Sequence, residues 1–150
     1  MSTSISQLPG RIDAALDAPW KMRAMAIVDA IVLNVIILLL ARVITGDWPV
    51  ATVGDDEQTI GIAQVIVVTA LAGLVAWGLL ALLERVTSNA KTVWTAIAVV
   101  VFLLSLFGPF GSGEGTSSKV VLALMHVGAA ATIIPLMLRS TAGDRPDDRR

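Results

Sequence analysis

Four long apolar segments, joined by short polar stretches, constrain the fold of this chain more than any other feature of its sequence. They cover about residues 24–44, 59–83, 92–107 and 119–138. A helix needs about 20 apolar residues to cross the hydrocarbon core of a bilayer, and these segments approach or exceed that length. Charged residues make up only 15% of the chain, whereas a soluble surface needs roughly 25%. The sequence therefore predicts an all-α polytopic membrane protein, a bundle of four transmembrane helices.

Side chains that carry chemistry are scarce. The chain has no Cys, which excludes disulfides, thiolate catalysis and Cys-ligated zinc or iron–sulfur sites. It has one histidine, His126, and no phosphate-binding glycine loop, nucleophile elbow or paired acidic metal motif. The net charge of −1 gives no reason to expect a nucleic acid partner. We expect no enzymatic activity, no cofactor and no metal.

The polar stretches predict the connections. In the cytoplasmic N-terminal segment, residues 1–23, apolar side chains recur at helical spacing, which predicts either a short interfacial helix or a disordered tail. Residues 45–58 are acidic and rich in turn formers. Gly108-Pro109 is expected to close the third apolar segment, and residues 111–115 to form a flexible loop. Residues 140–150 lack the apolar side chains needed to fold and predict a disordered cytoplasmic tail.

Basic residues are distributed unevenly between the two sides of the predicted membrane. Nine of the eleven lie in the N-terminal segment, the loop between the second and third apolar segments, and the C-terminal tail: Arg11, Lys21, Arg23, Arg85, Lys91, Arg139, Arg145, Arg149 and Arg150. Arg42 and Lys119 lie on the other side, with most of the loop carboxylates. Short cytoplasmic loops retain Lys and Arg, so we expect both termini in the cytoplasm of a multi-pass plasma-membrane protein surrounded by membrane lipids.

Several short motifs occur in an order that resembles a known family. They are residues 77–85 (WGLLALLER), 91–94 (KTVW), 104–109 (LSLFGP), 124–126 (LMH) and 134–135 (IP). In this order and spacing, over about residues 24–139, they resemble a family of small actinobacterial four-helix membrane proteins known only as a domain of unknown function. The resemblance implies a four-span fold in a plasma membrane and no particular activity.

Asp29, Glu84 and Arg85 form an inner layer of polar side chains near the cytoplasmic ends of the first two apolar segments. A charge at the bilayer centre costs about 2.5–3.5 kcal/mol on insertion scales, so each such group needs a partner or a function. Arg85 or Lys91 lies at a height where it could neutralise Asp29. Asp29 is therefore a member of a structural ion pair, a carboxylate reached by water, or a group that loads and releases a proton during transport.

Asn34, Gln64 and His126 lie deeper or further towards the outer side. His126 is expected to be a packed histidine that hydrogen-bonds a neighbouring helix, with Gln64, at matching depth, as its natural partner. Asn34 follows Asp29 by five residues, so the two side chains diverge by about 140° around the helix and cannot face the same neighbour. Asn34 is expected to form a hydrogen bond between helices.

Small residues form a stripe along the second apolar segment. Thr69, Gly73 and Ala76 share one helix face, which Glu84 continues. This face is expected to contact the other helices and to turn Glu84 inward. Gly128 predicts a similar contact face on the fourth segment.

Two classes of function remain open. The first is a structural or accessory membrane component without catalytic activity, associated with copies of itself or with a partner membrane protein. The alternative is a small oligomeric transporter or channel in which Asp29 is the proton- or ion-responsive group. No internal repeat supports the transporter class.

Overall fold

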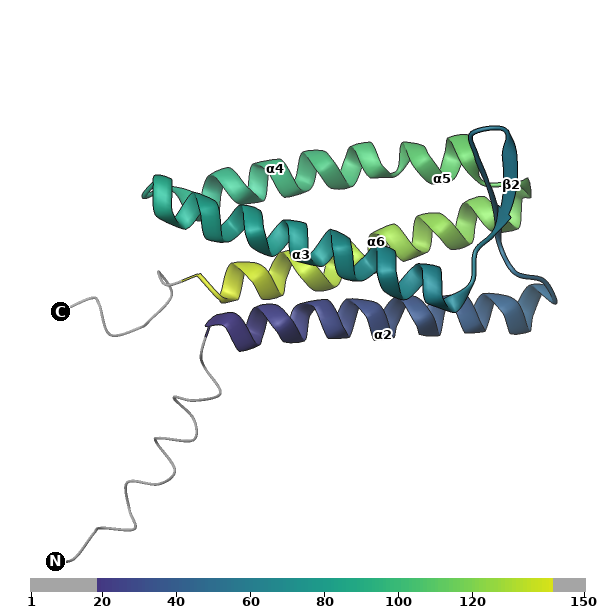
Figure 1. The fold of residues 1–150 in the computed structure, drawn as a ribbon, viewed down its shortest axis with the longest axis horizontal. Helices are drawn as coiled ribbons and strands as arrows, with labels where there is room; N and C mark the ends of the chain where they lie inside the picture. Colours follow the sequence, from purple (N-terminus) through teal and green to yellow (C-terminus); the bar gives the residue numbers. More distant parts are fainter. Residues whose placement is uncertain (1–18, 142–150) are drawn as a thin grey trace, which may run out of the picture.

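The computed structural model describes residues 19–141 (Figure 1). Its elements, in chain order, are α2 (Pro19–Thr45), β1 (Val50–Val53), β2 (Asp56–Thr59), α3 (Ile62–Val86), α4 (Ala90–Ser105), α5 (Phe107–Ser112) and α6 (Gly115–Arg139). Within this part of the chain, four helical stretches are long and apolar enough to cross a membrane: α2, α3, α4 with α5, and α6. The predicted all-α class with four membrane-length helices is confirmed. The predictions for residues 1–18 and 142–150 lie outside the described residues.

The long helices lie side by side, with α3 and α6 between α2 and α4 (Figure 1). α2 packs against α3 and α6, and α4 packs against the same two helices. α2 begins and α6 ends at one end of the molecule, here called the basic end. The strands β1 and β2 lie at the opposite end, here called the hairpin end.

Buried apolar side chains form two clusters, one in each half of the molecule. The cluster towards the basic end consists of Ala26, Ile27, Ala30, Leu80, Trp94, Ile133 and Met137. The cluster towards the hairpin end consists of Leu38, Ala41, Ala51, Ile60, Val65, Val121 and Met125. The small-residue stripe on α3 is buried at Thr69 and Gly73, so it contacts other helices as predicted.

The helices begin at residues other than those the apolar segments predict. α2 begins at Pro19 rather than at residue 24, so Arg23 lies within the helix. The N–H groups of the first turn of a helix have no partner within the helix, so proline, which lacks an N–H, is tolerated there and permits this earlier start. α3 begins at Ile62 rather than at residue 59, because Thr59 is paired with Val50 in the hairpin.

The third predicted segment and the loop after it differ from the structure. The sequence predicts a helix end at Gly108-Pro109, but α5 continues the helical path of α4 and includes both residues. Pro109 lies in the first turn of α5, where no backbone N–H is needed. Residues 111–112, predicted to belong to a flexible loop, are instead the last residues of α5. Only Gly113 and Glu114 connect α5 to α6, so the junction between the two helices is short. A Cβ on Gly113 would lie 2.7 Å from the carbonyl oxygen of Pro109, so this junction requires glycine.

The acidic connection after α2 contains a hairpin that the sequence pattern does not predict. β1 and β2 are antiparallel, with Val53 opposite Asp56. Gly54 forms the turn with a φ of 69°, a conformation that glycine adopts without steric cost. The amide of Glu114 donates to the carbonyl oxygen of Val50 at 2.9 Å. The hairpin is therefore fastened to the junction between α5 and α6.

Candidate functional site

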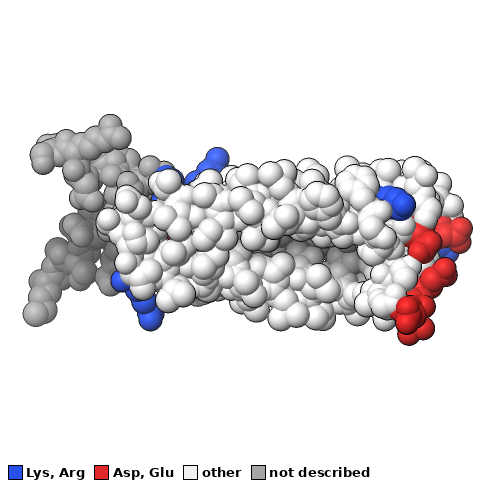
Figure 2. Space-filling model, turned by 90° about the horizontal axis from the view of Figure 1, so that it is seen from above, with Lys and Arg blue, Asp and Glu red and all other residues white. Residues whose placement is uncertain are grey.

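Charged side chains among the described residues gather at the two ends of the molecule (Figure 2). The hairpin end carries Asp47, Asp55, Asp56, Glu57 and Glu114 together with Arg42 and Lys119. The basic end carries Lys21, Arg23, Arg85, Lys91 and Arg139 together with Glu84. Asp29 is the one charged residue placed along the helices between these two groups. The middle of the molecule is thus suited to hydrocarbon, and its few polar groups are the candidates for function.

At the basic end, Arg23 joins three helices. Its Nη2 lies 2.5 Å from Oε1 of Glu84 at the end of α3. Its Nε donates to Oγ of Ser140, just after α6, at 2.9 Å. The Arg23 side chain is only 7% exposed, whereas that of Glu84 is 30% exposed. The guanidinium is thus neutralised and hydrogen-bonded, as a buried cation must be.

Helix ends add to this arrangement. α3 and α6 both end at the basic end, so the negative ends of their dipoles point towards Arg23. Nη2 of Arg23 also lies 3.5 Å from the carbonyl oxygen of Ser140. Oγ of Ser140 donates to the carbonyl oxygen of Met137 at 2.6 Å. The prediction that the tail is disordered from residue 140 is wrong at its start, since Ser140 and Thr141 are both buried.

Asp29 is not part of this junction. It is exposed on α2, about 9 Å along the helix from Arg23, and its neighbours Met25, Val28 and Val32 are exposed apolar side chains. Within residues 19–141, no ion pair or hydrogen bond joins Asp29 to another residue. Arg85, one of its predicted partners, is also exposed and forms no ion pair with it. The ion pair that the structure forms at this end uses Arg23 and Glu84 instead.

Midway along the helices, Asn34 connects α2 to α3. Its Nδ2 donates to Oγ1 of Thr69 at 3.1 Å, so Asn34 forms the interhelical hydrogen bond expected of it. Asn34 is 4% exposed, and its Oδ1 has no hydrogen-bond partner. A Cβ on Gly128 would lie 3.3 Å from this oxygen, which shows how closely α6 approaches Asn34. Asn34 and Asp29 occupy different faces of α2, as their spacing predicts.

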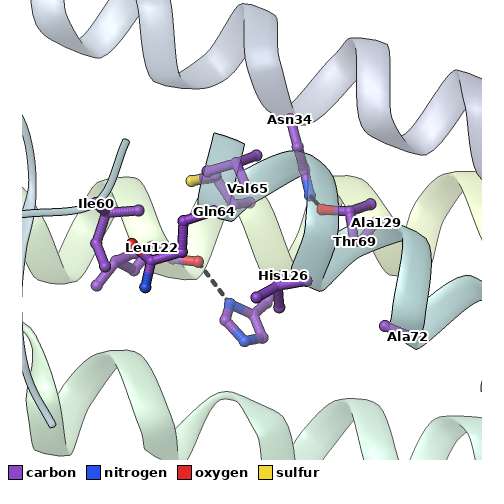
Figure 3. A pocket seen from close by; sticks show the side chains of 11 residues that line it. Asn34, Ile60, Gln64, Val65, Thr69, Ala72, Leu122, His126 and Ala129 are labelled. Atoms are coloured by element: carbon purple, nitrogen blue, oxygen red, sulfur yellow. Dashed lines mark hydrogen bonds between the residues drawn. The ribbon is translucent and has the colours of Figure 1, made fainter. Parts of the chain in front are cut away.

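Asn34 and Thr69 also border a cavity of about 210 Å³, here called the side cavity, between α3 and α6 (Figure 3). Gln64 and His126, the other two predicted polar positions, line the same cavity. Nδ1 of His126 lies 2.7 Å from the carbonyl oxygen of Leu122, one turn earlier on its own helix. The prediction that His126 bonds a neighbouring helix is therefore not met. The imidazole reaches the carbonyl four residues back, and Gln64 forms no hydrogen bond within residues 19–141.

Trp94 contributes to packing rather than to an exposed site. The indole is 1% exposed and its Nε1 donates to the carbonyl oxygen of Ala76 on α3 at 2.9 Å. A buried Trp needs such a partner for its N–H, and here that bond joins α4 to α3.

The sequence pattern does not reveal Arg23 and Ser140 as structural partners, because they lie in the predicted polar segments 1–23 and 140–150. The available signals were a basic residue in the first turns of a helix and a serine directly after the last turn of another. Neither signal identifies its partner, since Arg23 and Ser140 are 117 residues apart. The polar groups that the structure brings together are therefore Arg23, Glu84 and Ser140 at one level, and Asn34, Gln64, Thr69 and His126 at another.

A family model named DUF6069 matches residues 14–143, which include all four long helices and both polar levels. The chain belongs to the DUF6069 family. This family is described as one of unknown function, in agreement with the resemblance that the sequence motifs show. No curated protein and no solved structure matches this DUF6069 chain. Within the described part of the chain, no three His, Cys, Asp or Glu side chains are placed to hold a metal ion.

Proposed function

We propose that this chain is a structural or accessory component of the plasma membrane, a four-helix bundle with both termini in the cytoplasm and no catalytic activity. Its polar groups support this role because most of them connect helices. Arg23 joins α2, α3 and the end of α6, and Asn34 joins α2 to α3. Groups used in this way hold a bundle together and leave few side chains for chemistry.

The outward position of Asp29 is the main observation in favour of the accessory role. Charged residues within membrane helices almost always face the helix bundle or a water-filled cavity, where they find a partner. Asp29 instead lies on the exposed face of α2 among apolar side chains and pairs with no other described residue. A cationic or hydrogen-bonding group on a partner membrane protein, or on a second copy of this chain, would satisfy the carboxylate there.

The same observation supports a second candidate, a small oligomeric transporter or channel. If copies of the chain assemble through the exposed face of α2, Asp29 lies between them, where it takes up and releases a proton or ion. The two candidates differ in what the Asp29→Asn variant loses: a bound partner protein in the first case, and an ion-driven flux in the second.

The test compares wild-type protein, Asp29→Asn and Asp55→Asn after purification from native cells in mild detergent, with mass spectrometry of the proteins that co-purify. Asp55 is an exposed carboxylate in the hairpin turn and serves as the matched control. We expect Asp29→Asn to lower the recovered amount of a partner protein, or of the homo-oligomer, about tenfold or more. Asp55→Asn should leave that amount unchanged.

Flux measurements in reconstituted vesicles separate the two candidates. A pH-gradient-driven flux that requires Asp29, together with a pure homo-oligomer, would replace the accessory role by transport. Equal recovery of partners with both variants would show that Asp29 is not the contact, and the accessory role would lose its main support.

A further inference from the structure

The side cavity has apolar walls that contain no charged side chain. Its lining includes Ile60, Val65, Val68 and Met125, and none of its lining residues is Lys, Arg, Asp or Glu. A charged headgroup would have to leave water for this site without a counter-charge, which is costly. An occupant of the cavity must therefore be uncharged and mostly hydrocarbon.

His126 offers one open polar atom to this cavity. The carbonyl oxygen of Leu122 can only accept, so Nδ1 of His126 carries the hydrogen of their 2.7 Å hydrogen bond. In the neutral ring, Nε2 is then an acceptor. No described residue donates to Nε2.

Gln64 offers a second polar group, because its amide lines the cavity, forms no hydrogen bond within residues 19–141 and can donate as well as accept. Asn34 lies deeper, and its amide is less accessible. Its Nδ2 is used by Thr69, and this bond orients the amide so that Oδ1 is the atom left over. That oxygen is buried beside Gly128 of α6, so Asn34 borders the cavity without offering it an acceptor. The same bond holds the amide in place, because Thr69 lies on the adjacent helix.

From these groups we infer that the side cavity binds an uncharged, hydroxyl-bearing apolar molecule of the membrane, of the long-chain alcohol class. Nε2 of His126 accepts and the amide of Gln64 can donate, so a hydroxyl group, which does both, fits the two open groups, and the walls select a hydrocarbon body. Water could bridge His126 and Gln64, but it would leave the apolar remainder of the cavity unfilled. This site is additional to the proposed function and does not depend on a partner at Asp29.

The experiment uses the full chain in phosphatidylcholine nanodiscs with a hexadecanol that carries a photoreactive diazirine on its chain. Unlabelled hexadecanol and its methyl ether serve as competitors, because the ether keeps the chain and the oxygen but lacks the hydroxyl hydrogen. We expect labelling at residues of the side cavity, with the ether competing about tenfold more weakly than the alcohol. Equal competition by the two compounds would overturn the requirement for a donor.

Variants of the cavity wall complete the test. Ala72 lines the cavity and is exposed, so Ala72→Phe fills the space without removing a polar group; Leu71→Phe places the same ring at an adjacent exposed position outside the lining. We expect Ala72→Phe to reduce labelling about tenfold or more and Leu71→Phe to leave it unchanged. His126→Leu should weaken binding of the alcohol about five- to tenfold while binding of the ether stays the same. Equal labelling of the Ala72→Phe and Leu71→Phe proteins would show that the cavity is not the binding site.

Discussion

Arg23 and Glu84 show how a buried charge is made tolerable in this protein. The guanidinium would be costly among apolar side chains, but the carboxylate 2.5 Å away and the two oxygens of Ser140 surround it with acceptors. Removal of one partner from such a group leaves an uncompensated charge, and this costs more than the pair itself contributes. The junction therefore specifies which helix ends meet at the basic end.

At this scale we predict that Glu84→Gln lowers the free energy of unfolding by about 2 kcal/mol, because Arg23 keeps its charge but loses its counter-ion. This loss is smaller than the loss expected for a fully buried pair, because the Glu84 side chain is 30% exposed. Thermal unfolding in mild detergent, followed by circular dichroism, measures the change. Arg85→Gln, at the adjacent exposed position, is the control and should change stability by less than about 0.5 kcal/mol. Similar losses in both variants would contradict a specific role for the Arg23–Glu84 pair.

Among the elements, α3 has the clearest division between a packed and an exposed face. Thr69, Gly73 and Leu80 are buried, whereas Leu71 and Val75 are exposed. In lipid the hydrophobic effect does not drive apolar helices together, so close approach and interhelical hydrogen bonds must do so. α3 meets both needs on one face, with close approach at Gly73 and a hydrogen bond at Thr69.

Two glycines of α3 should respond to alanine in opposite directions. A Cβ on Gly73 would lie 2.7 Å from Cγ1 of Ile27, so Gly73→Ala must displace the Ile27 side chain or push α2 and α3 apart, and it should cost about 1–3 kcal/mol. Gly78 has no atom within 4 Å of such a Cβ, and Gly78→Ala should stabilise by about 0.5–1 kcal/mol through the higher helix propensity of alanine. Chemical or thermal unfolding in detergent tests both. Destabilisation by Gly78→Ala, or none by Gly73→Ala, would contradict this assignment of faces.

At the scale of the whole molecule, the separation of charge gives the two ends different characters. Five of the seven described basic residues lie at the basic end, and five of the seven described acidic residues lie at the hairpin end. Basic residues in short loops stay in the cytoplasm, whereas acidic residues contribute little to orientation. The distribution therefore predicts that the hairpin faces outward.

Because the chain has no Cys, single cysteines can report this orientation without background. Asp55→Cys in the hairpin turn and Ser88→Cys in the loop between α3 and α4 both occupy exposed positions. With a maleimide that does not cross membranes, we expect the first to be labelled in intact cells and the second only after permeabilisation. The reverse pattern would place the termini outside the cell.

Several structural features were predictable from local sequence, and others were not. The interhelical role of Asn34 and the inward stripe at Thr69 and Gly73 follow from polarity and spacing on one helix. The sequence pattern does not predict the hairpin or the continuation of the helical path through Pro109. Turn formers and proline usually end a helix, whereas here they begin a new element. The partner of His126 was also missed, since its own helix supplies the acceptor.

The sequence alone determined the all-α class and the approximate places of four membrane-length helices. This information is local: hydrocarbon excludes unpaired backbone groups, so each apolar segment of sufficient length must be helical whatever its neighbours are. The tertiary structure decided that Arg23 meets Glu84 and Ser140, that Asp29 faces outward, and that Asn34 and His126 border one cavity. A helix that is apolar on all sides carries little periodic signal for its inward face, so packing against partners distant in the sequence sets its rotation and the polar contacts that result.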